Sequence, residues 1–108
     1  MSYKEGTIKF WIRISLNPTW LKDTLGYSFI DKMVGDAKVK ILKTPDMKLY
    51  VEHYHPLTYF RTLSYDLNLL DKEKDHHIVL TWSPIDLILY IDGKPVAKIE
   101  NRLEALVV

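Results

Sequence analysis

The sequence predicts an all-β domain of antiparallel strands, a sandwich or a barrel, and two observations support this fold class. Short segments in which apolar and polar residues alternate follow one another along the chain, and residues that favour turns separate them. Alternation with a period of two is typical of a strand with one buried face, whereas no helical apolar period of useful length occurs. Roughly eight short strands between turn signals are typical of such folds.

The clearest strand covers residues 7–16, where apolar side chains alternate with mostly polar ones. The apolar face consists of Ile8, Phe10, Ile12, Ile14 and Leu16. Asn17-Pro18 ends this strand, because proline has no N–H group to donate to a neighbouring strand. The connection that follows, Thr19–Leu25, contains Trp20.

Further segments continue the pattern to the end of the chain. The expected strands are Tyr27–Met33, Ala37–Lys43, Met47–Tyr54, Leu57–Tyr65, His76–Ser83, Ile85–Asp92 and Lys94–Glu100, with Arg102–Val108 as a last strand. Asp92-Gly93 predicts a tight hairpin, because a type I′ turn needs positive φ at both central residues and Asp and Gly tolerate it. A single helical turn fits within Asn17–Leu25 or Leu67–Lys74.

Length and composition limit the classes of protein that fit. The 108 residues suit one domain, 1–108, and the net charge of +1 provides no basic field for nucleic acid. Cysteine is absent, which excludes disulfides and thiolate chemistry. The polar N-terminus lacks the apolar core of a signal peptide, and no segment approaches the ~18–20 apolar residues that cross a bilayer. We therefore expect a soluble chain without membrane insertion, in a compartment that the sequence leaves open.

Two segments resemble a known family pattern. The first is Gly6-Thr7-Ile8-Lys9-Phe10-Trp11-Ile12, and the second runs from His77 through Thr81-Trp82 to Asp92-Gly93 and Val96. In this order they resemble a short version of the laminin-G-like domain of the concanavalin A-like lectin/glucanase superfamily. The resemblance implies a jelly roll of two antiparallel sheets, one of them often concave. Members mostly bind glycans or proteins, and some are glycoside hydrolases.

The chain departs from the family pattern after the Asp-Gly hairpin, because family domains continue with further strands before a closing strand. Leu103–Val108 either forms a shortened closing strand beside Gly6–Leu16 or leaves an edge unpaired. Unpaired apolar edges tend to pair with other chains. Self-association through a terminal edge strand, with a homo-oligomer as its outcome, is therefore one hypothesis.

Aromatic residues on polar faces are the candidates for a ligand site, since sugar rings stack on Trp and Tyr while nearby polar groups bond the hydroxyls. Trp11 falls on the polar face of the first strand, and Trp20 lies in a loop. Tyr50, Glu52 and Tyr54 share the polar face of their strand. These five residues form the predicted ligand-binding set.

Other residues have simpler interpretations. Trp82 and Phe10 are expected in the core, and tyrosines commonly lie at a core margin. Tyr59, Arg61 and Tyr65 also share one face of their strand, and this face is a further candidate to line a concave sheet. The dense basic run is Lys38, Lys40 and Lys43. We interpret this run as edge-strand lysines that oppose aggregation rather than as a nucleic-acid site.

No catalytic residue or metal ligand is predicted. Retaining glycoside hydrolysis needs two carboxyl groups about 5–5.5 Å apart, and no glutamate pair on one strand has this spacing, although Glu52 with Asp31 or Asp66 across strands stays open. His53-x-His55 places two imidazoles on one strand face, half of a zinc or copper site, but Pro56 follows directly. We expect no cofactor, with calcium, found in several relatives, as the alternative.

The resemblance and the aromatic pattern together predict non-enzymatic recognition, foremost of a carbohydrate, through a concave aromatic and polar sheet face or its rim loops. One alternative is a structural or assembly domain that mediates protein–protein association. A glycoside hydrolase is the third, disfavoured by the missing carboxylate pair and the small size. Fold alone does not settle the choice.

Overall fold

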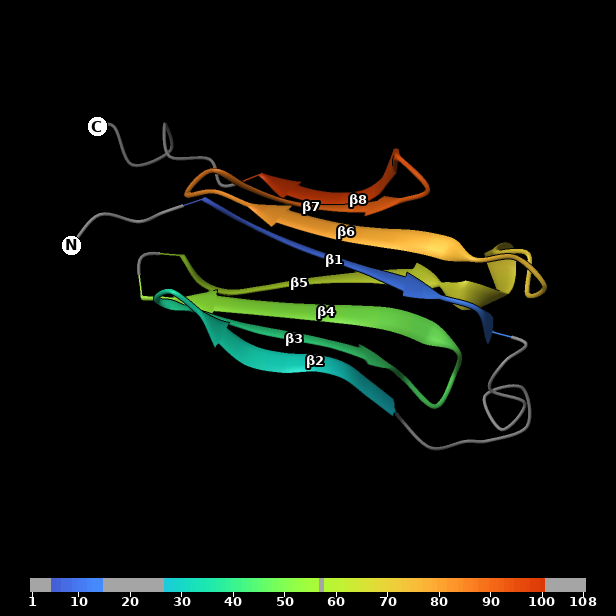
Figure 1. Ribbon diagram of the computed structural model, residues 1–108. Coiled ribbons are helices and arrows are strands. Elements are labelled where there is room, and N and C mark those ends of the chain that lie inside the picture. The colour runs from blue at the N-terminus through green and yellow to red at the C-terminus, as the bar shows by residue number, and fades with distance from the viewer. Residues whose placement is uncertain (1–4, 15–26, 57, 101–108) are drawn as a thin grey trace.

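The computed structural model describes residues 5–14, 27–56 and 58–100, which form a sandwich of two four-stranded antiparallel sheets (Figure 1). Sheet A has the strand order β1-β6-β7-β8 and sheet B the order β2-β3-β4-β5. The strands are β1 Gly6–Ile12, β2 Tyr27–Val34, β3 Ala37–Lys43, β4 Lys48–His55, β5 Tyr59–Asp66, β6 His76–Trp82, β7 Asp86–Ile91 and β8 Lys94–Glu100. The predicted all-β, antiparallel two-sheet fold is confirmed.

The core lies between the two sheets, and strict alternation along each strand builds it. In β3, β4, β6 and β7 every second residue is buried. Leu80 and Leu89 contribute from sheet A, and Ile41, Leu49 and Val51 contribute from sheet B, all without solvent exposure. Each inward apolar side chain therefore packs against the opposite sheet, and the outward positions of both sheets face solvent.

Trp82 and Phe10, both expected in the core, are buried to different degrees. Trp82 is buried in the core, whereas Phe10 is partly buried and packs against it. Gly6 is the register partner of Trp82, and a Cβ atom on Gly6 would overlap the indole ring. Glycine is required there because of this close approach.

The two sides of the sandwich bring edge strands of different sheets together. On one side β5 contacts β8. On the other, the ring of Phe10 in β1 lies 5.6 Å from that of Phe29 in β2, measured between centroids. These contacts couple the sheets at their margins as well as through the core.

The turns follow the predicted chemistry. Asp92 and Gly93 have φ values of 53° and 81°, the positive values that a type I′ hairpin requires. A 3₁₀ turn covers Leu67–Leu69, within one of the two segments that allow a helical turn. Trp20, the segment Asn17–Leu25 and the expected strand Arg102–Val108 lie outside the described residues.

Two interpretations of the sequence are wrong. The lysine run does not lie on an edge strand, because β3 has neighbours on both sides; Lys38 points outward and Lys43 is buried at 1% exposure. The face of β5 that carries Arg61 and Tyr65 points inward, with Arg61 buried, so Phe60 occupies the outward face instead. The central position of β3 depends on the order of strands, which the alternation of one strand does not encode. The outward position of Phe60 follows from the alternation of β5 once Arg61 faces inward.

Within the described part of the chain, no helix has the length and apolar character needed to cross a membrane.

Candidate functional site

The outer face of sheet B carries the best candidate site, and the strand register builds it in rows. One row crosses all four strands in the order Met33, Lys38, Tyr54 and Phe60. The neighbouring row consists of Asp31, Lys40, Glu52 and Thr62. Residues opposite each other in an antiparallel pair point to the same side, so each row presents its side chains to solvent together.

A shallow hollow of about 120 Å³ opens between these two rows, lined by Lys38, Lys40, Glu52, Tyr54 and Phe60. Tyr54 and Phe60 form one of its walls, with ring centroids 4.8 Å apart and ring planes inclined by 47°. Phe60 is 64% exposed, which is unusual for a residue whose burial is strongly favourable. The hollow therefore combines an accessible aromatic surface with charged groups.

The charged side chains of the hollow, all in the described part of the chain, do not form ion pairs with one another. Lys40 and Glu52 are register partners on adjacent strands. Among the described residues, no ion pair within 4.0 Å joins them, and none involves Lys38. Their side chains line the hollow and are thus accessible to a ligand.

The predicted ligand-binding residues fall on two opposite surfaces. Tyr50, Glu52 and Tyr54 lie on the outer face of sheet B, as alternation along β4 predicts, with Glu52 and Tyr54 in the hollow. Trp11 lies on the outer face of sheet A, so it does not share a surface with them. Trp20 lies outside the described residues. Face parity can be derived within a strand, but the sheet to which a strand belongs cannot.

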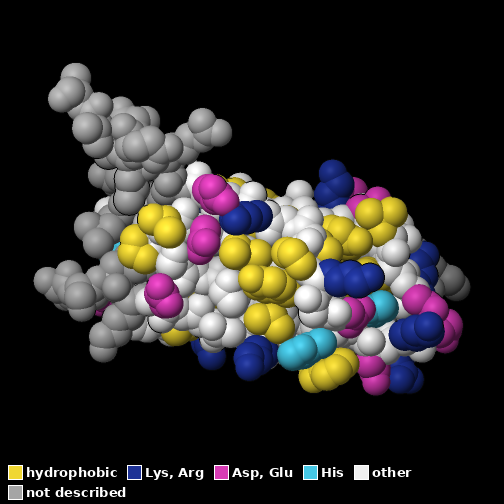
Figure 2. All heavy atoms as spheres, turned by 90° about the horizontal axis from the view of Figure 1, so that it is seen from above, with side chains coloured by type: hydrophobic (Ala, Val, Ile, Leu, Met, Phe, Trp, Pro, Cys, Tyr) yellow, Lys and Arg dark blue, Asp and Glu magenta, His cyan; other side chains and the backbone are white. Residues whose placement is uncertain are grey.

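Trp11 has a setting of its own on sheet A. It is 65% exposed, and its ring stacks on His77 of β6 with centroids 4.6 Å apart and planes inclined by 24°. The register of β1 and β6 makes these two residues direct partners. Seen from the side of sheet A, hydrophobic side chains gather in the middle of the molecule, with charged groups around them (Figure 2). Half-buried outward residues of sheet A include Val79, Ile88 and Tyr90.

Sequence reasoning missed three residues of the hollow as ligand candidates: Lys38, Lys40 and Phe60. The signal that could have found Phe60 is the alternation of β5, in which Phe60 and Arg61 necessarily point to opposite sides. The two lysines alternate correctly with Val39 and Ile41, but only the strand order reveals that they stand beside Tyr54 and Glu52.

The structure places the two carboxylates that the sequence left open as partners of Glu52, Asp31 and Asp66, in different surroundings. Asp31 and Glu52 share a row but stand two strands apart, with Lys40 between them. At the usual strand spacing this separation is about 9.6 Å between backbones, far beyond the distance of a retaining pair. Asp66 accepts a hydrogen bond of 2.9 Å from the backbone N–H of Asn68, and so caps the 3₁₀ turn.

The two histidines of the His53-x-His55 pattern do share one face, and that face is buried between the sheets. His53 Nδ1 lies 3.4 Å from the Nη2 atom of Arg61, and its ring lies 5.3 Å from that of Trp82. Burial, with the positive charge of Arg61 as a second cause, lowers the pKa of His53 to about 4. The described residues contain no group of three side chains that could hold a metal ion. A guanidinium group so close also opposes the binding of a cation.

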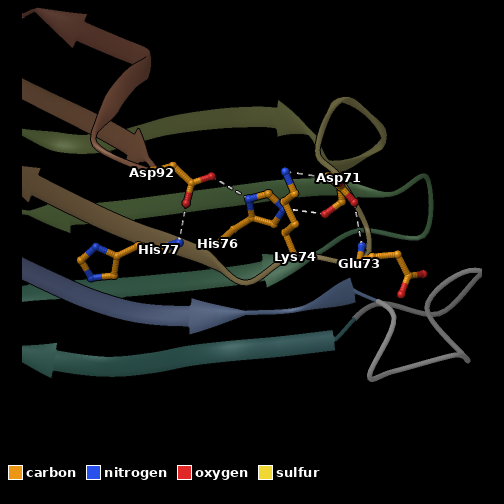
Figure 3. A network of polar contacts seen from close by, with 6 residues as sticks. All are labelled: Asp71, Glu73, Lys74, His76, His77 and Asp92. Carbon is orange, nitrogen blue, oxygen red and sulfur yellow. Dashed lines mark hydrogen bonds and ion pairs between the residues drawn. The ribbon is translucent and has the colours of Figure 1, made fainter.

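His76 and Asp92 form a hydrogen-bonded network at the opposite end of β6 from Trp82 (Figure 3). His76 Nδ1 donates to Asp92 Oδ2 at 2.6 Å, and His76 Nε2 donates to the backbone oxygen of Asp71 at 2.6 Å. The other oxygen of Asp92 accepts from the backbone N–H of His77 at 2.9 Å. Both imidazole nitrogens are therefore committed, and the network holds the loop before β6 to the β7–β8 turn.

This network shifts the titration of both partners. Burial opposes the charged form of His76, but the hydrogen bonds to Asp92 and Asp71 outweigh it and raise its pKa. Burial likewise opposes the charged form of Asp92, but the hydrogen bonds from His76 and His77 lower its pKa. Because neither ring nitrogen of His76 is accessible as a base, the network is structural.

Comparison with solved structures supports the fold. The catalytic domain of a laminarinase from Thermotoga maritima MSB8, solved in complex with cetyltrimethylammonium bromide, matches with a TM-score of 0.53 and 11% sequence identity. The match covers 99% of this chain and 47% of that chain, so this chain spans about half the length of that domain. No protein-family model matches the chain, and no curated protein does.

At this identity the likeness concerns the fold alone. It supports the antiparallel two-sheet jelly-roll sandwich expected from Gly6–Ile12 and His77–Val96. Membership of the concanavalin A-like superfamily stays an expectation from those motifs. The finer laminin-G-like assignment stays a prediction from those motifs.

Proposed function

We propose that this chain is a non-enzymatic carbohydrate-binding module whose binding surface is the outer face of sheet B. The observation that carries the proposal is the hollow in which the Tyr54–Phe60 aromatic pair stands beside Lys40 and Glu52. The laminarinase catalytic domain with a similar fold, a carbohydrate-active domain, adds support of a general kind.

The aromatic pair is suited to a sugar ring. Pyranose rings present flat C–H faces, which pack against aromatic rings and remove apolar surface from water. Phe60 is 64% exposed, and its ring lies at an angle of 47° to that of Tyr54, so the pair forms an angled corner rather than a flat stack. A ring bound in this corner would contact two aromatic surfaces at once.

The polar groups beside the pair supply hydrogen bonds to hydroxyl groups. The carboxylate of Glu52 accepts hydrogen bonds and the ammonium of Lys40 donates them, so together they match the two roles of a sugar hydroxyl. Tyr50 continues the same face four residues from Tyr54 on β4. At about 3.4 Å per residue, Tyr50 and Tyr54 are about 14 Å apart along the strand. A ligand longer than one sugar unit would be needed to contact both.

The arrangement of carboxylates favours binding over hydrolysis. Retaining glycoside hydrolysis needs two carboxyl groups about 5–5.5 Å apart. Asp31 and Glu52 lie two strands apart with Lys40 between them, so they do not form such a pair. We therefore retain a glycoside hydrolase only as an outcome to be tested, by reducing-sugar release and its dependence on Glu52.

The test is a glycan array probed with the purified chain, with and without calcium, followed by titration of each retained glycan by calorimetry. Tyr54→Ala and Phe60→Ala should each weaken binding by about ten- to a hundredfold, since stacking on an aromatic ring contributes roughly 1–3 kcal/mol. Trp11→Ala is the matched control, because it removes an equally exposed aromatic residue from the opposite sheet. Equal loss in all three variants, or no retained glycan, would contradict the proposal.

The second candidate function is association with protein, including a second copy of this chain. Exposed Trp11 and the apolar residues Val79, Ile88 and Tyr90 on the outer face of sheet A favour it (Figure 2). Light scattering over a range of concentrations tests self-association. A defined oligomer that Trp11→Ala dissociates, together with an empty glycan array, would favour this candidate over sugar binding.

A further inference from the structure

Resting on the proposed function, we infer that the sheet B hollow prefers acidic saccharides and that Lys38 determines this preference. The ligand class is a saccharide that bears a carboxylate or a sulfate group. The inference follows from the different surroundings of the two lysines in the hollow, which the strand register defines.

Lys40 stands between two carboxylates. Its register partner on β2 is Asp31, and its partner on β4 is Glu52. Directly opposed side chains of opposite charge attract each other across a sheet. No ion pair within 4.0 Å joins Lys40 to either carboxylate among the described residues, but its positive charge lies beside two negative ones. Lys40 therefore attracts an anionic ligand less strongly than a lysine without such neighbours.

Lys38 stands between two residues without charge. Its partner on β2 is Met33, and its partner on β4 is Tyr54. No carboxylate of the described residues forms an ion pair with Lys38. Lys38 is thus the cation of the hollow with no opposed anion, and with Lys40 and Glu52 it gives the lining a net charge of one positive unit.

The same register places Lys38 next to the aromatic pair. Lys38, Tyr54 and Phe60 are consecutive members of one row, on β3, β4 and β5. A sugar ring that packs against Tyr54 and Phe60 can direct one substituent toward Lys38 and its hydroxyl groups toward the row of Lys40 and Glu52. A carboxylate or sulfate at that substituent would form a charge-assisted hydrogen bond with the Lys38 ammonium.

The test compares saccharides that differ only in charge. The probes are oligogalacturonate and oligoglucuronate, each against its methyl ester, and a sulfated galactan oligosaccharide against its desulfated form. The wild-type chain should bind at least one acidic probe about tenfold more tightly than its neutral match at low salt. This preference should weaken as salt is added. The uronate and sulfate arms show which anionic group the site takes.

Lys38→Gln should abolish the preference by weakening binding of the acidic probe about tenfold while leaving the neutral probe unchanged. The control variant is Lys9→Gln, which removes an exposed lysine from the outer face of sheet A. Circular dichroism of each variant shows that the sandwich is intact.

The outcomes separate the two proposals. Neutral and acidic probes bound equally, or a preference that survives Lys38→Gln, would overturn the inference and leave sugar binding standing. If none of the saccharides, charged or neutral, is retained, both proposals fall. An acidic preference that Lys38→Gln removes and Lys9→Gln does not supports the inference.

Discussion

At the scale of single residues, buried polar side chains distinguish this core from a purely apolar one. His53 and Arg61 are register partners on the inner face of sheet B, each no more than 4% exposed. The hydrogen bond between the guanidinium and the neutral imidazole offsets part of the cost of burying these polar groups. Alternation along β4 predicts that His53 shares the buried face of Leu49 and Val51. That Arg61 of β5 stands opposite His53 depends on the pairing of the two strands.

The buried His53 should make the fold sensitive to acid. Its pKa is about 4 in the folded chain against 6.5 when unfolded, so between these values the unfolded chain binds more protons. The free energy of unfolding should therefore fall by roughly 3 kcal/mol as pH drops from 6.5 to 4. Urea unfolding at several pH values measures this fall.

Comparison with His53→Gln isolates the contribution of His53 from that of the carboxyl groups. This variant should lose stability less steeply than the wild type across the same pH range. His77→Gln, on the outer face of sheet A, is the control for the replacement of a histidine outside the core. Parallel curves for wild type and His53→Gln would show that His53 does not titrate as its burial requires.

At the scale of elements, the β7–β8 hairpin shows how turn chemistry and a side-chain network act together. Asp92 has positive φ at the turn, and its carboxylate also joins His76 and the backbone of His77. The sequence predicts the turn from Asp-Gly alone. The network with His76 depends on the pairing of β6 with β7, which brings residues 16 positions apart into contact.

Asp92→Asn separates the two roles of Asp92, because asparagine tolerates the turn conformation but lacks the charge. The variant should lower the pKa of His76, which NMR titration of the imidazole measures. Stability should fall by about 1 kcal/mol below pH 6.5, where His76 is charged, since Asp92 is nearly half exposed.

The sign of this effect with pH follows from the raised pKa of His76. The network stabilises fully below the unfolded value of 6.5, and its contribution is lost as pH rises through the folded value. The difference between wild type and Asp92→Asn should therefore shrink at high pH. A difference that grows from pH 6 to pH 9 would contradict the charged pair.

At the scale of the whole molecule, the two layers define which apolar residues stabilise the fold. Leu80 of β6 faces the opposite sheet and has no exposure, whereas Leu42 of β3 is half-buried on the outer face of sheet B. Leu80→Ala should lower the free energy of unfolding by about 3 kcal/mol, because it leaves a cavity between the sheets. Leu42→Ala should lower the free energy of unfolding by about 1 kcal/mol, because Leu42 is only half-buried and water fills the space that its side chain leaves. Denaturant titration compares them, and equal losses would contradict this assignment of the layers.

The sequence by itself determined the strands, their faces and the hairpin at Asp92-Gly93, because these depend on alternation and on local backbone preferences. It also placed Tyr50, Glu52 and Tyr54 on one outward face. Only the tertiary structure decided the strand order, and with it that Lys38 and Phe60 flank Tyr54 while Trp11 lies on the opposite sheet. The physical reason is that long-range pairing and core packing determine which strands are neighbours. Both depend on all eight described strands together, so the sequence pattern of one strand does not identify its neighbours.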